Sequence, residues 1–265
     1  MSDPTPLLEF FKRGEVDRDA RLLAARGALA PRAHEQLAIL ILLLDDADID
    51  VREAAAQTLG RIPVVPLAEF LARSDVPVAI REFFAARGIE PAGGAAEAGD
   101  DPLVDAGAAE VDDEPGLNAP NEPQSDEAGQ STTERLSKMG FSERLKAAVK
   151  GSREIRAILI RDPNRLIAAS VLSSPKVTEQ EVESFSRMAN VSDEVLRIIG
   201  KNRSWTKNYG VVVGLTKNPK TPLAMSMNMM ARLTDRDLQM LSIDRNIPEA
   251  LRIAARKRLQ AGQNR

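Results

Sequence analysis

Seven residues between Lys201 and Lys220 have the clearest capacity for chemistry, and that chemistry is binding. We call them the predicted basic surface: Lys201, Arg203, Trp205, Lys207, Tyr209, Lys217 and Lys220. If the turns of a helical repeat stack along one edge, the five charges form a ridge that faces an anionic partner, with the aromatic rings available for stacking on bases. The alternative is a solvated basic face in which Trp205 packs as a core anchor between helices.

A methionine-rich stretch follows this surface. Met225, Met227, Met229 and Met230 lie in a helix predicted over residues 221–231. Four methionines in six positions cover nearly every side of a helix, so we expect at least one to reach the surface, where flexible thioethers suit an adaptable groove. We assign Met227 to the candidate binding surface. The alternative is that all four fill a core.

Residues for a reaction are missing from the sequence. No nucleophile with its base, carboxylate pair, phosphate loop or ligand cluster can be assembled. The chain has no Cys and a single His, His34, which is expected to be a surface or capping residue. The four aspartates Asp45, Asp46, Asp48 and Asp50 have the spacing of a calcium loop but lack its glycine and distal glutamate, so we expect a turn whose Asp50 caps a helix. We predict no catalytic residue, no cofactor, no metal and no enzymatic activity.

Charge is strongly segregated along the 265 residues. Lys and Arg number 11 against 15 Asp and Glu in residues 1–90, none against 11 in 91–133, and 25 against 13 in 134–265. The middle stretch is rich in Ala, Gly and Pro, and its isolated apolar residues offer little burial to offset ordering entropy. The pattern predicts an N-terminal helical domain over 1–90, a disordered acidic linker over 91–133 and a basic helical-repeat domain over 134–265.

Helices must position the candidate surface, because strand-like alternation is nearly absent. Apolar residues make up 43% of the chain and aromatic residues only 3%, which is typical of cores filled by Leu, Ile, Val, Ala and Met. The first domain is expected to hold about six helices, near residues 7–11, 18–25, 34–44, 51–60, 67–71 and 78–86. The second is expected to hold helices near 142–149, 152–161, 164–173, 178–188, 192–201, 203–216, 221–231, 234–242 and 248–260.

The C-terminal helices carry start signals and internal repetition. The phrase at 190–198 recurs at 246–253, and the phrase at 172–178 recurs at 215–222. Repeated phrases of this kind indicate repeated pairs of helices. The residues expected to serve as N-caps are Thr178, Ser192, Thr221 and Thr234.

Two stretches resemble known families. Residues 43–55, in which an Asp-rich turn precedes Val51, Arg52 and an Ala-rich helix, resemble the HEAT-like repeat family. The C-terminal half resembles HEAT and leucine-rich-repeat-variant proteins, and phrases at 160–164, 190–197 and 217–222 are similar to a bacterial family without an assigned activity. The resemblance implies an all-α fold of two α-solenoid domains.

We therefore expect a non-enzymatic scaffold or adaptor that binds a protein partner through its helical-repeat surfaces, with the concave side of the C-terminal array as the recognition surface. The alternative is a nucleic-acid-binding protein that uses the basic C-terminal domain. The longest apolar run, residues 37–44, is too short to span a bilayer, and the first residues lack the pattern of a signal peptide. A cytoplasmic location without a membrane span is expected.

Overall fold

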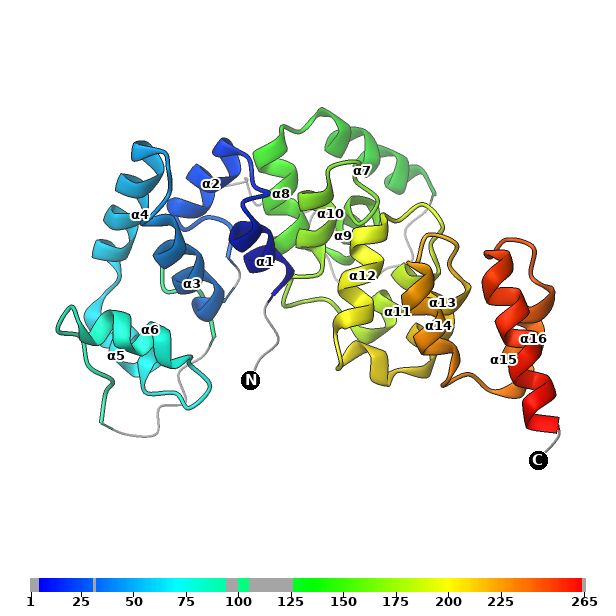
Figure 1. Ribbon diagram of the computed structural model, residues 1–265. Helices are drawn as coiled ribbons and strands as arrows, with labels where there is room; N and C mark the ends of the chain where they lie inside the picture. The colour runs from blue at the N-terminus through cyan, green and yellow to red at the C-terminus, as the bar shows by residue number, and fades with distance from the viewer. Residues whose placement is uncertain (1–4, 31, 94–99, 105–125, 264–265) are drawn as a thin grey trace. The chain divides into compact units, whose positions relative to one another are not determined.

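The computed structural model describes residues 5–30, 32–93, 100–104 and 126–263, and within these ranges it contains helices and no strand (Figure 1). The expected all-α class is confirmed for the described residues. The chain divides into two compact units, Met1–Arg156 with Ser173–Pro175, and Ala157–Leu172 with Lys176–Arg265. The division falls near residue 156, whereas the sequence suggested a domain that starts at residue 134. No described helix is long and apolar enough to cross a membrane.

The first unit begins with short helices that pack on α3 and α4. Its helices are α1 (Pro6–Arg13), α2 (Arg18–Ala25), α3 (Ala33–Leu43), α4 (Ile49–Arg61), α5 (Val64–Leu71), α6 (Val78–Ala85), α7 (Asp126–Lys138) and α8 (Phe141–Lys150), and α9 (Arg153–Leu159) crosses into the second unit. α3 contacts α1, α2 and α4. One core cluster joins Ala33 and Leu37 of α3 to Phe70 and Leu71 of α5 and Phe84 of α6.

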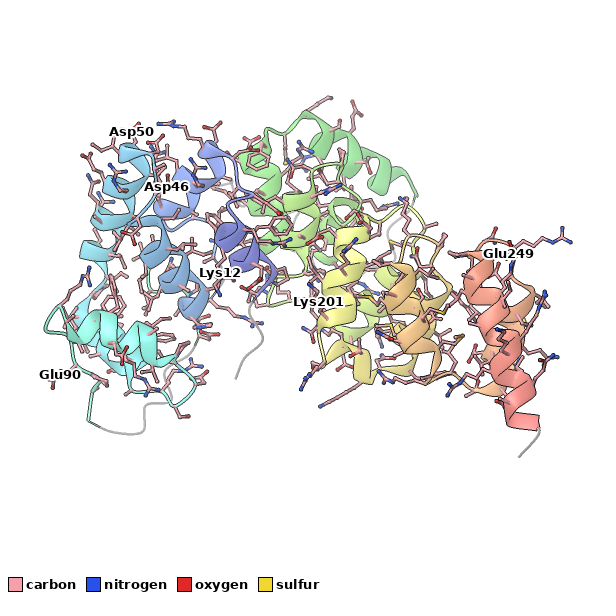
Figure 2. The ribbon with its side chains drawn as sticks, in the orientation of Figure 1. Lys12, Asp46, Asp50, Glu90, Lys201 and Glu249 are labelled. Carbon is pink, nitrogen blue, oxygen red and sulfur yellow. The ribbon has the colours of Figure 1, made fainter. Side chains whose placement is uncertain are left out.

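An aspartate of the Asp-rich turn caps α4, as expected, but it is not the aspartate that was predicted. Asp48 is the N-cap, and its carboxylate accepts the Asp50 amide at 2.9 Å. The prediction that Asp50 is the cap is therefore wrong by two residues. Asp50 pairs instead with Arg18 at 2.5 Å, which also binds Asp48 at 2.6 Å. Arg18 opens α2, so these pairs align the starts of α2 and α4, where Figure 2 shows Asp46 and Asp50.

The second unit alternates its helices between two layers. Its helices are α10 (Arg165–Val171), α11 (Glu179–Arg187), α12 (Asp193–Lys201), the 3-10 helix η1 (Trp205–Lys207), α13 (Tyr209–Lys217), α14 (Leu223–Met230), α15 (Asp235–Ile243) and α16 (Glu249–Gln263). α11 packs on α13, whose Tyr209 and Lys217 reach Asp237 of α15. α10 packs on α12, Gly200 of α12 lies against Met225 of α14, and α14 packs on α16 (Figure 1).

Two glycines on one side of α13 allow α11 to approach closely. A Cβ atom on Gly210 would overlap the carboxylate of Glu183, and one on Gly214 would overlap the hydroxyl of Ser186. Increasing residue numbers on α11 thus meet increasing numbers on α13, so the two helices run in the same direction. Beyond the end of α13, the side-chain amide of Asn218 donates to the carbonyl oxygens of Ser186 at 2.9 Å and Met188 at 3.0 Å, at the end of α11.

Three of the four expected N-caps are confirmed. Thr178 accepts the Glu181 amide in a capping box, Ser192 accepts the Val195 amide, and Thr234 accepts the Asp237 amide. The fourth, Thr221, is wrong: Pro222 is the N-cap of α14, and the buried Thr221 hydroxyl has no hydrogen-bond partner within the described parts of the chain. Pro222 can occupy this position because its ring fixes φ, at −53°, while its ψ of 131° is the extended value typical of an N-cap.

The range predicted as linker differs from the expectation at two places. α7 begins at Asp126, and residues 100–104 lie against the helices of the first unit, with Leu103 and Val104 packed on its core cluster. The linker prediction rested on apolar residues that are isolated in the sequence, but Leu103 and Val104 are adjacent. Their amides also donate to the Gln36 side chain, a contact that composition does not reveal. Residues 94–99 and 105–125 of the predicted linker lie outside the described residues.

Candidate functional site

The second unit divides the predicted basic surface between two edges. Because α11 and α13 run in the same direction and short turns join each helix to the next, successive connections lie at opposite ends of the helices. We call the connections at 202–208 and 231–234 the 202–208 edge, and those at 188–192 and 218–222 the 218–222 edge. The prediction of a single basic ridge assumed that every turn lies on one side of the helices. The turns lie on two sides, so the basic residues are divided between two edges.

The 202–208 edge carries three cations that are free to bind. Lys201 ends α12, where Figure 2 labels it, and Arg203 and Lys207 follow in the connection to α13. All three are exposed, and their side chains form no ion pair or hydrogen bond with any described residue. The Arg232 guanidinium donates to the Thr206 carbonyl oxygen at 2.6 Å and so joins the two connections of this edge.

Tyr209 and Lys217 are committed to a network inside the unit. The Tyr209 hydroxyl donates to the Asp237 carboxylate at 2.6 Å, and the Lys217 ammonium lies 2.9 Å from the other oxygen of that carboxylate. The Tyr209 hydrogen bond, followed by that from Lys217, lowers the pKa of Asp237. The Thr234 amide donates to the Tyr209 hydroxyl at 3.0 Å. These contacts join α13 to α15, so neither side chain is free for a ligand without breaking them.

The 218–222 edge places Lys220 beside a small pocket. Lys220 is exposed, and its side chain has no ion-pair partner among the described residues. The pocket, of about 270 Å³, is lined by Arg187, Val213, Gly214, Lys217, Asn218 and Pro219. Arg187 pairs with Glu183 at 2.5 Å, in the preceding turn of its own helix. The edge therefore has one free cation next to two that already have carboxylate partners.

Trp205 is half-buried, an environment between the buried core anchor and the exposed stacking residue that the sequence left open. It opens η1, and its amide and that of Ser204 both donate to the Asn202 side chain, at 3.2 and 2.9 Å. The helix predicted over 203–216 is in fact broken at Asn208, which caps α13 by accepting the Gly210 amide at 2.8 Å. Trp205 consequently sits in a connection, and a role as a fully buried anchor between helices is not what the structure shows.

Replacing Trp205 by Ala is expected to destabilise the protein moderately. Truncation of a fully buried tryptophan costs about 3 to 5 kcal/mol, and half-burial should bring this to about half. Chemical unfolding of the full-length variant measures the loss, and the emission maximum of this single Trp reports its environment. A native emission as red as that of the denatured chain would contradict the half-buried position.

The methionines of α14 split between the core and the surface layer. Met229 and Met230 are buried, while Met225 and Met227 are half-buried. The expectation that at least one is accessible is met in part by Met227, the residue assigned to the candidate surface. Met225 is held against Gly200 of α12, where a Cβ would overlap its sulfur atom. Only Met227 therefore remains as a candidate contact residue of this group.

Sequence reasoning missed the polar features of the first unit. Glu35 and Gln36 of α3 are fully buried, and one Glu35 oxygen has no hydrogen-bond partner among the described residues. His34 is half-buried, with its amide 3.5 Å from the Asp100 carboxylate. Two adjacent polar residues at the start of an otherwise strongly apolar helix were the available signal, because long polar side chains rarely enter cores without a partner.

A larger pocket lies between α2 and α4. Its volume is about 790 Å³, and its lining is mixed in charge, with Arg18, Arg26, Arg61, Asp50 and Glu53 around Leu22 and Ala54. Arg26 and Arg61, at the ends of their helices, are exposed, and neither side chain has a described partner. Within the described residues, no group of three or more His, Cys, Asp and Glu side chains is placed to hold a metal ion.

In comparisons with known proteins, no protein-family model, no curated protein and no solved structure matches the chain.

Proposed function

We propose that this protein is a non-enzymatic interaction scaffold or adaptor, and that its second unit is a HEAT-like helical array that binds an acidic segment of a protein partner. The 202–208 edge is the contact surface in this proposal. The chemistry of the edge selects carboxylate-rich segments.

The layered packing supports the helical-array part of the proposal. Helices of the second unit alternate between two layers, and each layer continues by contact with the next helix but one, as in α11 on α13 and α14 on α16. In repeat proteins this arrangement makes each pair depend on its neighbours and presents rows of connections as binding surfaces. The repeated phrases at 190–198 and 246–253 fall on the starts of α12 and α16, which share a layer.

The observation that carries the binding part is the trio of unpartnered cations at the 202–208 edge. Lys201, Arg203 and Lys207 lie within seven consecutive positions. In contrast, the other cations of α11, α12 and α13 have carboxylate partners: Arg187 pairs with Glu183, Arg197 with Asp193 and Lys217 with Asp237. Exposed like charges held close together without counterions repel one another, and an anionic partner relieves that repulsion. Residues 134–265 carry 25 basic against 13 acidic residues, so the field around the edge attracts anions as well.

Nucleic acid is the second candidate, because the same cations would meet phosphates. Sequence-tolerant binding of single strands normally adds aromatic platforms for successive bases. Here Tyr209 is bound to Asp237 and Thr234, and Trp205 is half-buried. Tyr209 is 42% exposed, so the edge offers two accessible rings. Two rings are few for a row of successive bases, and they support a protein partner better than a nucleic-acid strand.

Titration with a single-stranded oligonucleotide of about 20 nucleotides tests this choice, since base stacking on an aromatic ring contributes about 1 to 3 kcal/mol per base. At physiological ionic strength we expect weak association without quenching of Trp205, the only Trp in the chain. The full-length protein and a Lys201→Glu, Arg203→Glu, Lys207→Glu variant are compared. Saturable quenching in the wild type that disappears in the variant would favour the nucleic-acid function instead.

A further inference from the structure

Residues 100–104 lie on the first unit in the way that a bound peptide lies on its receptor. The segment Asp100–Val104 forms neither helix nor strand, yet its main chain is hydrogen-bonded to α3 at both ends. Its neighbours on either side, residues 94–99 and 105–125, lie outside the described residues. The contacts of these five residues alone therefore define what the surface recognises.

Gln36 recognises the main chain of this segment. Its side-chain oxygen accepts the amides of Leu103 at 2.9 Å and Val104 at 3.1 Å, and its nitrogen donates to the Val104 carbonyl oxygen at 2.6 Å. The same nitrogen donates to the Gly27 carbonyl oxygen at 3.2 Å. Every hydrogen-bonding group of this side-chain amide is thus used, while the residue is only 1% exposed. The three hydrogen bonds between Gln36 and this segment reach only main-chain atoms, so they do not depend on which side chains the segment carries.

Asp100 fixes the other end of the segment at the start of α3. Its carbonyl oxygen accepts the Ala33 amide at 3.0 Å, and its carboxylate lies 3.5 Å from the His34 amide and 4.0 Å from the Arg73 guanidinium. Free amides at a helix start and a nearby guanidinium both favour a negative group. This position therefore selects an acidic residue.

Leu103 and Val104 supply the apolar part of the contact. Both are half-buried and pack against the core cluster that contains Leu37 and Phe70. Val104 also lines the 790 Å³ pocket between α2 and α4, in which Arg26 and Arg61 have no described partner. A ligand that continues beyond the Val104 position faces this pocket, and an acidic residue there would meet the two arginines.

We propose that the surface formed by α3, α5 and α6 is a recognition site for an extended segment of a partner protein, with the pattern acidic-x-x-apolar-apolar followed by an acid. The chain's own Asp100–Val104 segment occupies the site and competes with the partner. This site is separate from the 202–208 edge and does not depend on the function proposed for that edge. Domains that bind extended peptides commonly use hydrogen bonds to the peptide main chain for affinity and pockets for its side chains for specificity. Here Gln36 would supply the main-chain hydrogen bonds.

The test is binding of a fluorescein-labelled synthetic peptide with the sequence of residues 99–106 to full-length protein. A tethered competitor has an effective concentration in the millimolar range, so weakening it should strengthen binding of the free peptide by at least ~10-fold. The weakened variant is Leu103→Ser with Val104→Ser, and adding Gln36→Ala should abolish binding. A control peptide with serine at the same two positions should not bind.

Two readouts separate the outcomes. If the folded double variant binds the peptide no better than the wild type does, the proposal is overturned. If the double variant fails to fold, hydrogen exchange at the Leu103 and Val104 amides of the wild type decides: excess peptide should accelerate their exchange by displacing the segment. Unchanged exchange under saturating peptide would refute the site, and concentration-dependent dimers that are lost in the double variant would assign it to a second copy of this chain instead.

Discussion

The Glu35→Gln variant is expected to be about 3 kcal/mol more stable than the wild type at pH 8 and nearly equal to it at pH 4. Glu35 lies in α3 with no exposed surface, and burial raises its pKa to about 7. The Thr5 hydroxyl donates to one carboxylate oxygen, and the other has no hydrogen-bond partner in the described ranges. Glutamine keeps an oxygen for Thr5 and carries no charge to bury.

The sign follows from the two pKa values of Glu35. In the unfolded chain the group titrates near its ordinary value of 4.5, and in the folded chain near 7, so the folded state binds the proton more tightly. Between these values stability falls as pH rises, and each unit corresponds to about 1.4 kcal/mol. The stability contributed by the neutral form is complete below pH 4.5 and is lost as pH passes 7. The nearby charges, Arg32 and Asp100, act in opposite directions and leave burial as the main cause.

Denaturant unfolding of both proteins at pH 4, 5 and 8 measures this difference, with about 1 kcal/mol expected at pH 5 from the same linkage. Glu53→Gln is the matched control, because Glu53 is an exposed glutamate of the same unit. A Glu35→Gln difference that does not change between pH 4 and pH 8 would contradict a buried carboxyl that titrates near neutrality.

The Gly214→Leu variant is expected to lose about 3 kcal/mol of unfolding free energy, the upper part of the usual range for overpacking. A Cβ at Gly214 would overlap the Ser186 hydroxyl and stand 3.1 Å from the Arg187 Cγ atom, so a leucine must push α11 away from α13. Separation of these helices would also weaken the hydrogen bonds from Asn218 to Ser186 and Met188.

Two comparisons make this prediction specific. Gly60→Leu in α4 meets nothing within 4 Å and should gain up to about 1 kcal/mol from helix propensity. The Ser186→Gly change should recover part of the loss in a Gly214→Ala background, because it removes the nearest clashing atom. Equal stability of Gly214→Leu and wild type would show that α11 and α13 are not closely packed.

The elements that the sequence predicted well are those determined by neighbouring residues. Helix starts at Thr178, Ser192 and Thr234 follow from a side-chain oxygen three residues before the amide whose hydrogen bond it accepts. The all-α class follows from composition and periodicity. The predicted caps Thr221 and Asp50 failed because another possible cap lies within two residues of each, Pro222 and Asp48, and the sequence does not decide between them.

The parts that the sequence missed depend on contacts between distant residues. The direction in which α11 and α13 run decides that Lys207 and Lys220 lie on opposite edges, and that direction depends on Gly210 and Gly214 meeting Glu183 and Ser186. Gln36 meets residues 103 and 104 across more than sixty positions. No local sequence pattern near residues 100–104 indicates that Gln36 is their partner. A composition-based linker prediction could not find it.

The most direct test of the proposed function is capture of partners by full-length protein from a cell extract, with and without nuclease. The wild type is compared with the Lys201→Glu, Arg203→Glu, Lys207→Glu variant and with a control that reverses Arg165 and Lys257, two exposed cations elsewhere on the same unit. We predict that wild type and control capture the same acidic proteins in both extracts and that the 202–208 variant loses them. Capture that disappears with nuclease, or that survives the triple reversal, would contradict binding of a protein partner at this edge.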